Sequence, residues 1–161
     1  MGGINAIYSR IAGCLALRCE MRRALSVLAC AGTLALASPS MADMLKMKAD
    51  LKASNEVPPA KSSGSGSVDV TYDTGKKMLS WKGTYSGLTG AATAAHFHAG
   101  ESGKNGGVVV PIFQGAAAKS PFEGSKQLTD AQAAQLMAGG WYVNIHTAAN
   151  KAGEIRGQVV K

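Results

Sequence analysis

Strict alternation of apolar and polar residues is the feature that most constrains what this chain can fold into. In residues 44–53 every second side chain from Leu45 to Ala53 is apolar, and three lysines and an aspartate lie between them. A period of two places the apolar side chains on one face of an extended strand. The lysine-rich opposite face is typical of a strand at the edge of a sheet. The pattern therefore predicts a half-buried β-strand.

Six further stretches carry a signature of extended structure, either alternating or continuously apolar. They span residues 68–72, 78–85, 92–99, 108–113, 141–147 and 154–160. The turn residues at 73–75 join the first two of these stretches into a hairpin. Seven short strands at this spacing predict an all-β fold, an antiparallel Greek-key or immunoglobulin-like β-sandwich.

One short helix is expected at about residues 129–138. Thr129 is a good N-cap, and Gln132, three residues later, completes a capping box. The glycines at 139 and 140 end the helix. Only 17% of the 161 residues are charged and 20 are glycine, a composition that excludes helical bundles and coiled coils.

The first 42 residues predict a leader that contains a secretory signal peptide at residues 21–42. Arg22 and Arg23 precede an almost uninterrupted apolar run over residues 24–37, and small residues at 40 and 42 form a cleavage site. The run is shorter than the roughly 20 residues that a membrane span needs. We therefore expect a secreted or periplasmic protein, whose domain is residues 43–161, with no membrane span after removal of the signal.

The true start, Met1 or Met21, stays open, and so does periplasm against extracellular space. All three cysteines precede Asp43, so disulfides and thiolate metal sites are excluded from the remaining domain. Cys30 also lies in a sequence similar to a lipoprotein box, but the apolar run before it is only six residues long.

The charge that remains after the leader is removed argues against nucleic acid as a partner, although the whole chain has a net charge of +7. Four of the 17 basic residues and one of the 10 acidic residues lie before Asp43, which leaves +4. Scattered lysines carry this charge, and Arg156 is the only arginine after residue 42. Nucleic-acid proteins instead cluster arginines and aromatic residues on one face.

The three histidines are the strongest candidates for chemistry. His96 and His98 share one face of a predicted strand, while His146 lies in another strand whose Val143 and Ile145 face inward. If these strands are neighbours, the three imidazoles form one face of a site for a single copper or zinc ion. Asn144 and Glu154 are expected on the same side, as hydrogen-bonding partners in a second shell around the metal.

An alternative interpretation is that the histidines only form hydrogen bonds that tie strand ends together. Arg156 on the same face argues against a bound cation unless Glu154 neutralises it. The sequence holds no Gly-x-Ser-x-Gly elbow and no grouped pair of carboxylates, so no catalytic residue is assigned. The chain is expected not to be a hydrolase, and a redox enzyme remains the open alternative.

Several motifs together resemble the CHRD domain, which was defined in the developmental regulator chordin and occurs in secreted bacterial proteins. The closing block is the most specific. The motifs are residues 51–59 (LKASNEVPP), 87–89 (GLT), 95–98 (AHFH), 142–147 (YVNIHT) and 153–158 (GEIRGQ). The resemblance covers residues 44–160.

The resemblance implies an extracytoplasmic all-β module with a binding or structural role, whose partner would be a protein or a polysaccharide. The cysteine-rich modules that accompany the domain in chordin are absent, so growth-factor binding is not implied. The segment from His96 to His98 is also similar to the His-Val-His segment of copper–zinc superoxide dismutases. Those enzymes need about six histidines, and this chain has three.

Two hypotheses follow. The leading one is a binding or structural module with an unknown ligand. The competing one is a mononuclear copper or zinc protein that handles metal or carries out a redox reaction. Convergence of the three imidazoles decides between them.

Overall fold

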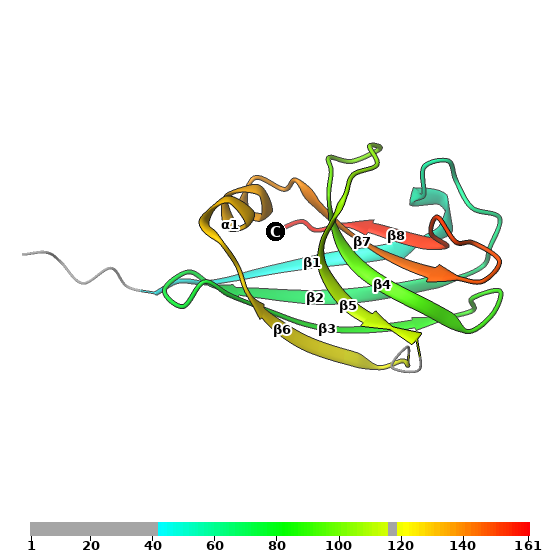
Figure 1. Ribbon diagram of the computed structural model, residues 1–161, viewed down its shortest axis with the longest axis horizontal. Coiled ribbons are helices and arrows are strands. Elements are labelled where there is room, and N and C mark those ends of the chain that lie inside the picture. Colours follow the sequence, from blue (N-terminus) through cyan, green and yellow to red (C-terminus); the bar gives the residue numbers. More distant parts are fainter. Residues whose placement is uncertain (1–41, 116–118) are drawn as a thin grey trace, which may run out of the picture. The chain divides into compact units, whose positions relative to one another are not determined.

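The computed structural model describes residues 42–115 and 119–161 (Figure 1). The predicted leader lies outside these residues, except for Ala42. In the described part of the chain, no helix is long and apolar enough to cross a membrane.

Eight antiparallel strands form the fold, in one continuous sheet. They are β1 (Met44–Lys52), β2 (Ser65–Asp73), β3 (Met78–Ser86), β4 (Ala92–Ala99), β5 (Val108–Gln114), β6 (Phe122–Gln127), β7 (Trp141–Thr147) and β8 (Ile155–Gln158). Their order in the sheet is β5-β4-β7-β8-β1-β2-β3-β6. The sheet curls until its two edge strands, β5 and β6, approach each other, which gives a nearly closed barrel (Figure 1).

The all-β antiparallel prediction is confirmed, whereas the sandwich and Greek-key details are not. All seven predicted strands are present, and β2 begins at Ser65, three residues earlier than predicted. The helix α1 (Asp130–Met137) starts after Thr129, and the capping box between Thr129 and Gln132 is formed as expected. A short 3-10 helix, η1 (Ala53–Asn55), ends β1.

The core fills the inside of the curled sheet. Alternation along each strand supplies it, because Phe97 in β4 and Val143 and Ile145 in β7 are fully buried. Trp81 packs edge-on against Phe97, with ring centres 5.3 Å apart. Side chains on the opposite face of the same strands are therefore directed away from this core.

Strand β6 was not predicted from the sequence. Its sequence, FEGSKQ, has one apolar side chain, Phe122, and lacks the alternation that reveals the other strands. The strand pairs with β3 so that Gly83 lies opposite Phe122 and Gly124 opposite Trp81. A Cβ atom at either glycine would overlap the facing ring, so the two glycines let the two rings lie flat across the strand pair.

Candidate metal centre

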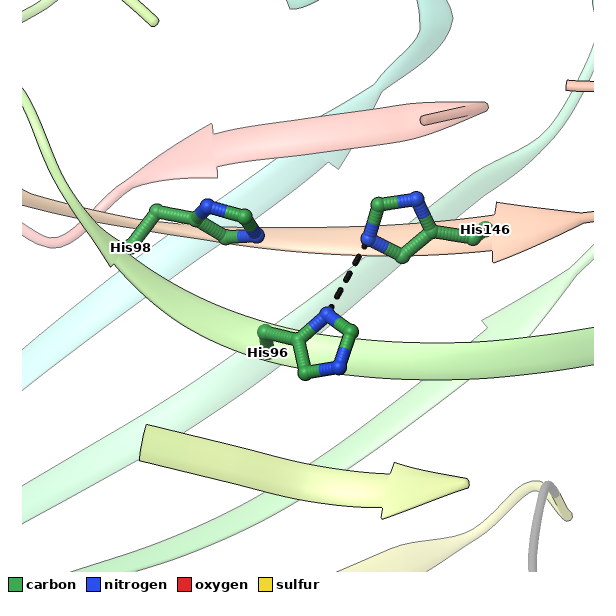
Figure 2. A group of neighbouring side chains, drawn as sticks. All are labelled: His96, His98 and His146. Carbon is green, nitrogen blue, oxygen red and sulfur yellow. Dashed lines mark hydrogen bonds between the residues drawn. The ribbon is translucent and has the colours of Figure 1, made fainter. Parts of the chain in front are cut away.

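The structure brings the three predicted histidines together. His96 and His98 lie on β4, and β7 pairs with β4 so that His146 lies opposite Ala94 and Asn144 opposite His96. One ring nitrogen from each histidine lies within 4.8 Å of the other two (Figure 2). The closest pair is His96 Nδ1 and His146 Nε2, at 3.2 Å. Nitrogens that bind one tetrahedral zinc ion at about 2.0–2.1 Å lie about 3.3 Å apart. Metal binding by these residues stays a prediction.

Backbone carbonyl groups fix the protonation of two of the rings. His98 Nδ1 lies 3.0 Å from the Gly106 oxygen, and His146 Nδ1 lies 3.0 Å from the Lys151 oxygen. A carbonyl oxygen only accepts hydrogen bonds, so both Nδ1 atoms carry the proton. Both Nε2 lone pairs are then presented to the cluster. Protein metal sites use this same contact to orient their histidine ligands.

One of these lone pairs has no partner in the described part of the chain. His146 Nε2 accepts the hydrogen bond from His96 Nδ1, but His98 Nε2 is buried and unpaired. An unsatisfied buried acceptor costs about 1–3 kcal/mol. A cation between the rings would satisfy it, so the chemistry of these nitrogen donors fits a metal ion.

The three imidazoles favour the neutral form. Burial is the main cause that lowers the pKa of each ring below its ordinary value. The neighbouring histidines lower the pKa of His96 further, and His146 and Arg156 do so for His98, whose hydrogen bond to Gly106 acts in the opposite sense. Neutral imidazole is the form that binds a metal, so no ring must lose a net proton near pH 7, and binding at His96 Nδ1 requires only that its proton move to Nε2.

Gly106 holds His98 by a close approach that only glycine permits. A Cβ atom at this position would overlap the Ala99 carbonyl oxygen. This close approach brings the Gly106 oxygen onto the histidine. Tyr142 supports the same loop, because its hydroxyl accepts a hydrogen bond from the Gly106 amide at 3.2 Å.

Tyr142 is also part of a stack of three side chains. Its ring lies parallel to that of His98, with an interplanar angle of 9° and centres 4.9 Å apart. The guanidinium carbon of Arg156 lies 3.4 Å from the centre of the Tyr142 ring. Two Nη atoms of Arg156 donate to the carbonyls of Glu101 and Lys104 and to the Asn105 side chain. The arginine therefore holds the loop that carries Gly106.

Asn144 lies beside the histidines, but its hydrogen bonds go to Glu56. Its Nδ2 atom is 3.0 Å from each carboxylate oxygen of Glu56, and its Oδ1 atom is buried without a partner. Burial raises the pKa of Glu56 to about 7, although the Arg156 charge and the Asn144 hydrogen bond act to lower it. From the sequence, Glu56 was only a member of a family motif and was given no role. Its position in the LKASNEVPP motif was the one signal that could have marked it.

Glu154, the other predicted second-shell residue, is fully buried and bonded to loops. Its carboxylate accepts hydrogen bonds from the hydroxyls of Ser62 (2.6 Å), Thr89 (2.7 Å) and Thr147 (2.6 Å), from the Thr89 amide (2.7 Å) and from the Asn150 side chain (3.0 Å). None of these donors is a histidine. Burial alone would raise the pKa of Glu154, but these hydrogen bonds lower it to about 2.

The fold and the cluster define an all-antiparallel β protein that carries three imidazoles on the face of the sheet opposite the core. Residues 47–159 match the family model of the CHRD domain, so the chain belongs to the CHRD-domain family. No curated protein and no solved structure was found to match the chain.

Proposed function

We propose that this chain is an extracytoplasmic CHRD module that binds one copper or zinc ion through His96, His98 and His146. The observation that carries the proposal is the pair of Nε2 lone pairs presented by His98 and His146, each fixed by a carbonyl on the opposite ring nitrogen. An all-imidazole ligand set suits copper and zinc. Three protein ligands leave one position open for water or a small substrate, as handling of metal or a redox reaction requires.

The location outside the cytoplasm rests on the predicted signal peptide at residues 21–42. The binding role associated with the CHRD family supports the proposal that this module binds a ligand. If the module does not bind a metal, the histidines serve only to hold β4 and β7 together. The ligand of the module is then a protein or a polysaccharide.

Metal content tests the proposal directly. The full chain is expressed with its leader, purified from the periplasm without a polyhistidine tag, and analysed by mass spectrometry of the elements. We expect close to one copper or zinc ion per chain, and none in the triple variant His96→Ala, His98→Ala, His146→Ala. Lys151→Ala is the matched control, because its side chain is exposed and its backbone carbonyl remains. An empty wild-type protein, even after incubation with both metals, overturns the proposal.

The role of the Gly106 carbonyl gives a second test. Gly106→Ala forces the loop away from Ala99 and so removes the acceptor of His98 Nδ1. Loss of such a contact weakens metal affinity by about 10- to 100-fold. Gly107→Ala is the control, because a Cβ atom there meets nothing within 4 Å. Competition with a chromophoric chelator measures both, and equal affinities would contradict the assigned role.

A further inference from the structure

Two buried groups of opposite charge lie beside the three histidines, and the proposed metal binding does not use either as a ligand. Arg156 is 2% exposed and Glu56 is 6% exposed. Asn144 lies between them, because it pairs with Arg156 across β7 and β8 and donates its side-chain hydrogen bonds to Glu56. The same Asn144 lies opposite His96 in the neighbouring pair of strands.

The arginine is connected to the histidine cluster through one aromatic ring. Its guanidinium carbon is 3.4 Å from the centre of the Tyr142 ring, which also stacks on the parallel ring of His98, with ring centres 4.9 Å apart. The partners of its Nη atoms are two carbonyl oxygens and one amide oxygen, which carry no net charge. A guanidinium stays charged at every pH of interest. Its positive charge therefore acts both on Glu56 and on the cluster, where it lowers the pKa of His98.

The charge of a bound ion responds to such neighbours in a definite direction. Reduction of Cu²⁺ to Cu⁺ lowers the charge of the site by one unit, so a nearby cation favours the reduced ion and a nearby anion favours the oxidised one. At roughly 10 Å and an effective dielectric constant of about 20, one unit charge changes an equilibrium constant by roughly tenfold. Burial limits the screening of this effect by salt.

We propose that Arg156 and Glu56 are specificity-determining residues that set which charge state of the metal this site prefers. Arg156 favours singly charged Cu⁺ over doubly charged Cu²⁺ and Zn²⁺, and Glu56 opposes it. The proposal rests on the proposed function, because it needs a metal ion at the three histidines.

The opposite signs separate this role from a structural one. If the two residues only held the loops in place, replacing either would loosen the site and change the metal preference in the same direction. As charge-setting residues they must change it in opposite directions. Glu56→Gln keeps the hydrogen bond with Asn144, and its new amide can donate to the unpaired Asn144 Oδ1. This variant is therefore expected to fold even if Arg156→Gln does not.

The experiment compares the wild type with Glu56→Gln, Arg156→Gln, the double variant and Arg156→Lys. Each protein is expressed as the full chain with its leader, purified from the periplasm and loaded with copper. The Cu²⁺/Cu⁺ midpoint potential is measured at pH 8, where Glu56 is mostly ionised because its pKa is about 7. We expect Arg156→Gln to lower the preference for Cu⁺ by about tenfold, a potential shift of about 59 mV. Glu56→Gln raises it by a similar factor, the double variant lies between them, and Arg156→Lys stays near the wild type.

Zinc provides a measurement that does not depend on redox chemistry. The affinity for Zn²⁺ should rise about tenfold in Arg156→Gln and fall about tenfold in Glu56→Gln. Shifts of the same sign in both variants, or no shift in Glu56→Gln, overturn the inference and leave the metal site in place. A wild-type protein that takes up neither metal overturns the proposed function itself, and this inference with it.

Discussion

Glu154 and Glu56 are the two buried glutamates in the described part of the chain, and their pKa values shift in opposite directions. Glu154 is fully buried and Glu56 is 6% exposed. Five hydrogen-bond donors surround Glu154, and its pKa is lowered to about 2. One amide nitrogen donates to Glu56, and its pKa is raised to about 7.

The comparison teaches that enough hydrogen-bond donors can overcome the effect of burial on the charge of a carboxylate in this fold. Desolvation raises the pKa in both cases, and only enough hydrogen bonds to the charged form overcome it. Glu154 is a permanent anion that connects the β7–β8 turn with the loops before β2 and β4. Glu56 is close to half-ionised at neutral pH and lies beside the histidine cluster. The carboxylate with a constant charge, Glu154, and the carboxylate that titrates near neutral pH, Glu56, therefore lie in different parts of the fold.

The largest effect is expected from neutralising the permanent anion. Glu154→Gln removes the charge that five donors stabilise, and we expect the free energy of unfolding to fall by about 3–5 kcal/mol at pH 7. Urea denaturation measures this loss. It should shrink as the pH falls from about 4.5 toward 2, because the lowered pKa of Glu154 supplies stability only where the carboxylate is ionised. Glu123→Gln, at an exposed ion pair with Lys82, is the control and should change stability by less than about 0.5 kcal/mol. A loss as small as the control's would remove the contrast between the two glutamates.

The opposite sign is expected at the other glutamate. The pKa of Glu56 is about 7 in the folded state and about 4.3 in an unfolded chain, so the folded protein binds more protons between these values. Wild-type stability from this group is therefore full below about pH 4.5 and decreases as the pH rises toward 7. Glu56→Gln stays neutral, and it should be more stable than the wild type by about 1–3 kcal/mol at pH 8 and nearly equal to it at pH 4. Unfolding curves at the two pH values decide, and a destabilised variant at pH 8 would show that the ionised form is the favoured one.

A smaller effect follows from removing one donor. Thr147→Val has nearly the same shape and loses the 2.6 Å hydrogen bond to Glu154. We expect a loss of about 1–2 kcal/mol and an increase in the pKa of Glu154. NMR titration of the carboxyl carbon measures the pKa, with Thr84→Val on the exposed side of β3 as the control. An unchanged pKa would mean that the remaining four donors are sufficient by themselves.

Alternation allowed much of the fold and half of the site to be predicted. It located seven strands and placed His96, His98 and His146 on the face opposite the core. It could not predict the strand order, because pairing between distant segments leaves no local pattern. It also missed β6, whose place depends on Gly124 fitting under Trp81 of another strand.

The hydrogen-bonding partners around the histidines could not be predicted from the sequence. Asn144 lies opposite His96 across β7 and β4, but its partner Glu56 comes from a loop about 90 residues earlier in the chain. Glu154 was expected near the metal because it begins the predicted strand 154–160, whose polar residues share one face. Its carboxylate instead meets hydroxyls from loops, and loop positions do not follow from a period of two.

The carbonyls of Gly106 and Lys151 hold the His98 and His146 rings in place before any ion arrives. The strands that carry these rings pack against the core on their other face. The two rings are therefore in position once the chain has folded. An ion that binds there has no segment to order and no tautomer to change at these two rings. If the histidines bind an ion as proposed, folding and loading can therefore take place at different times.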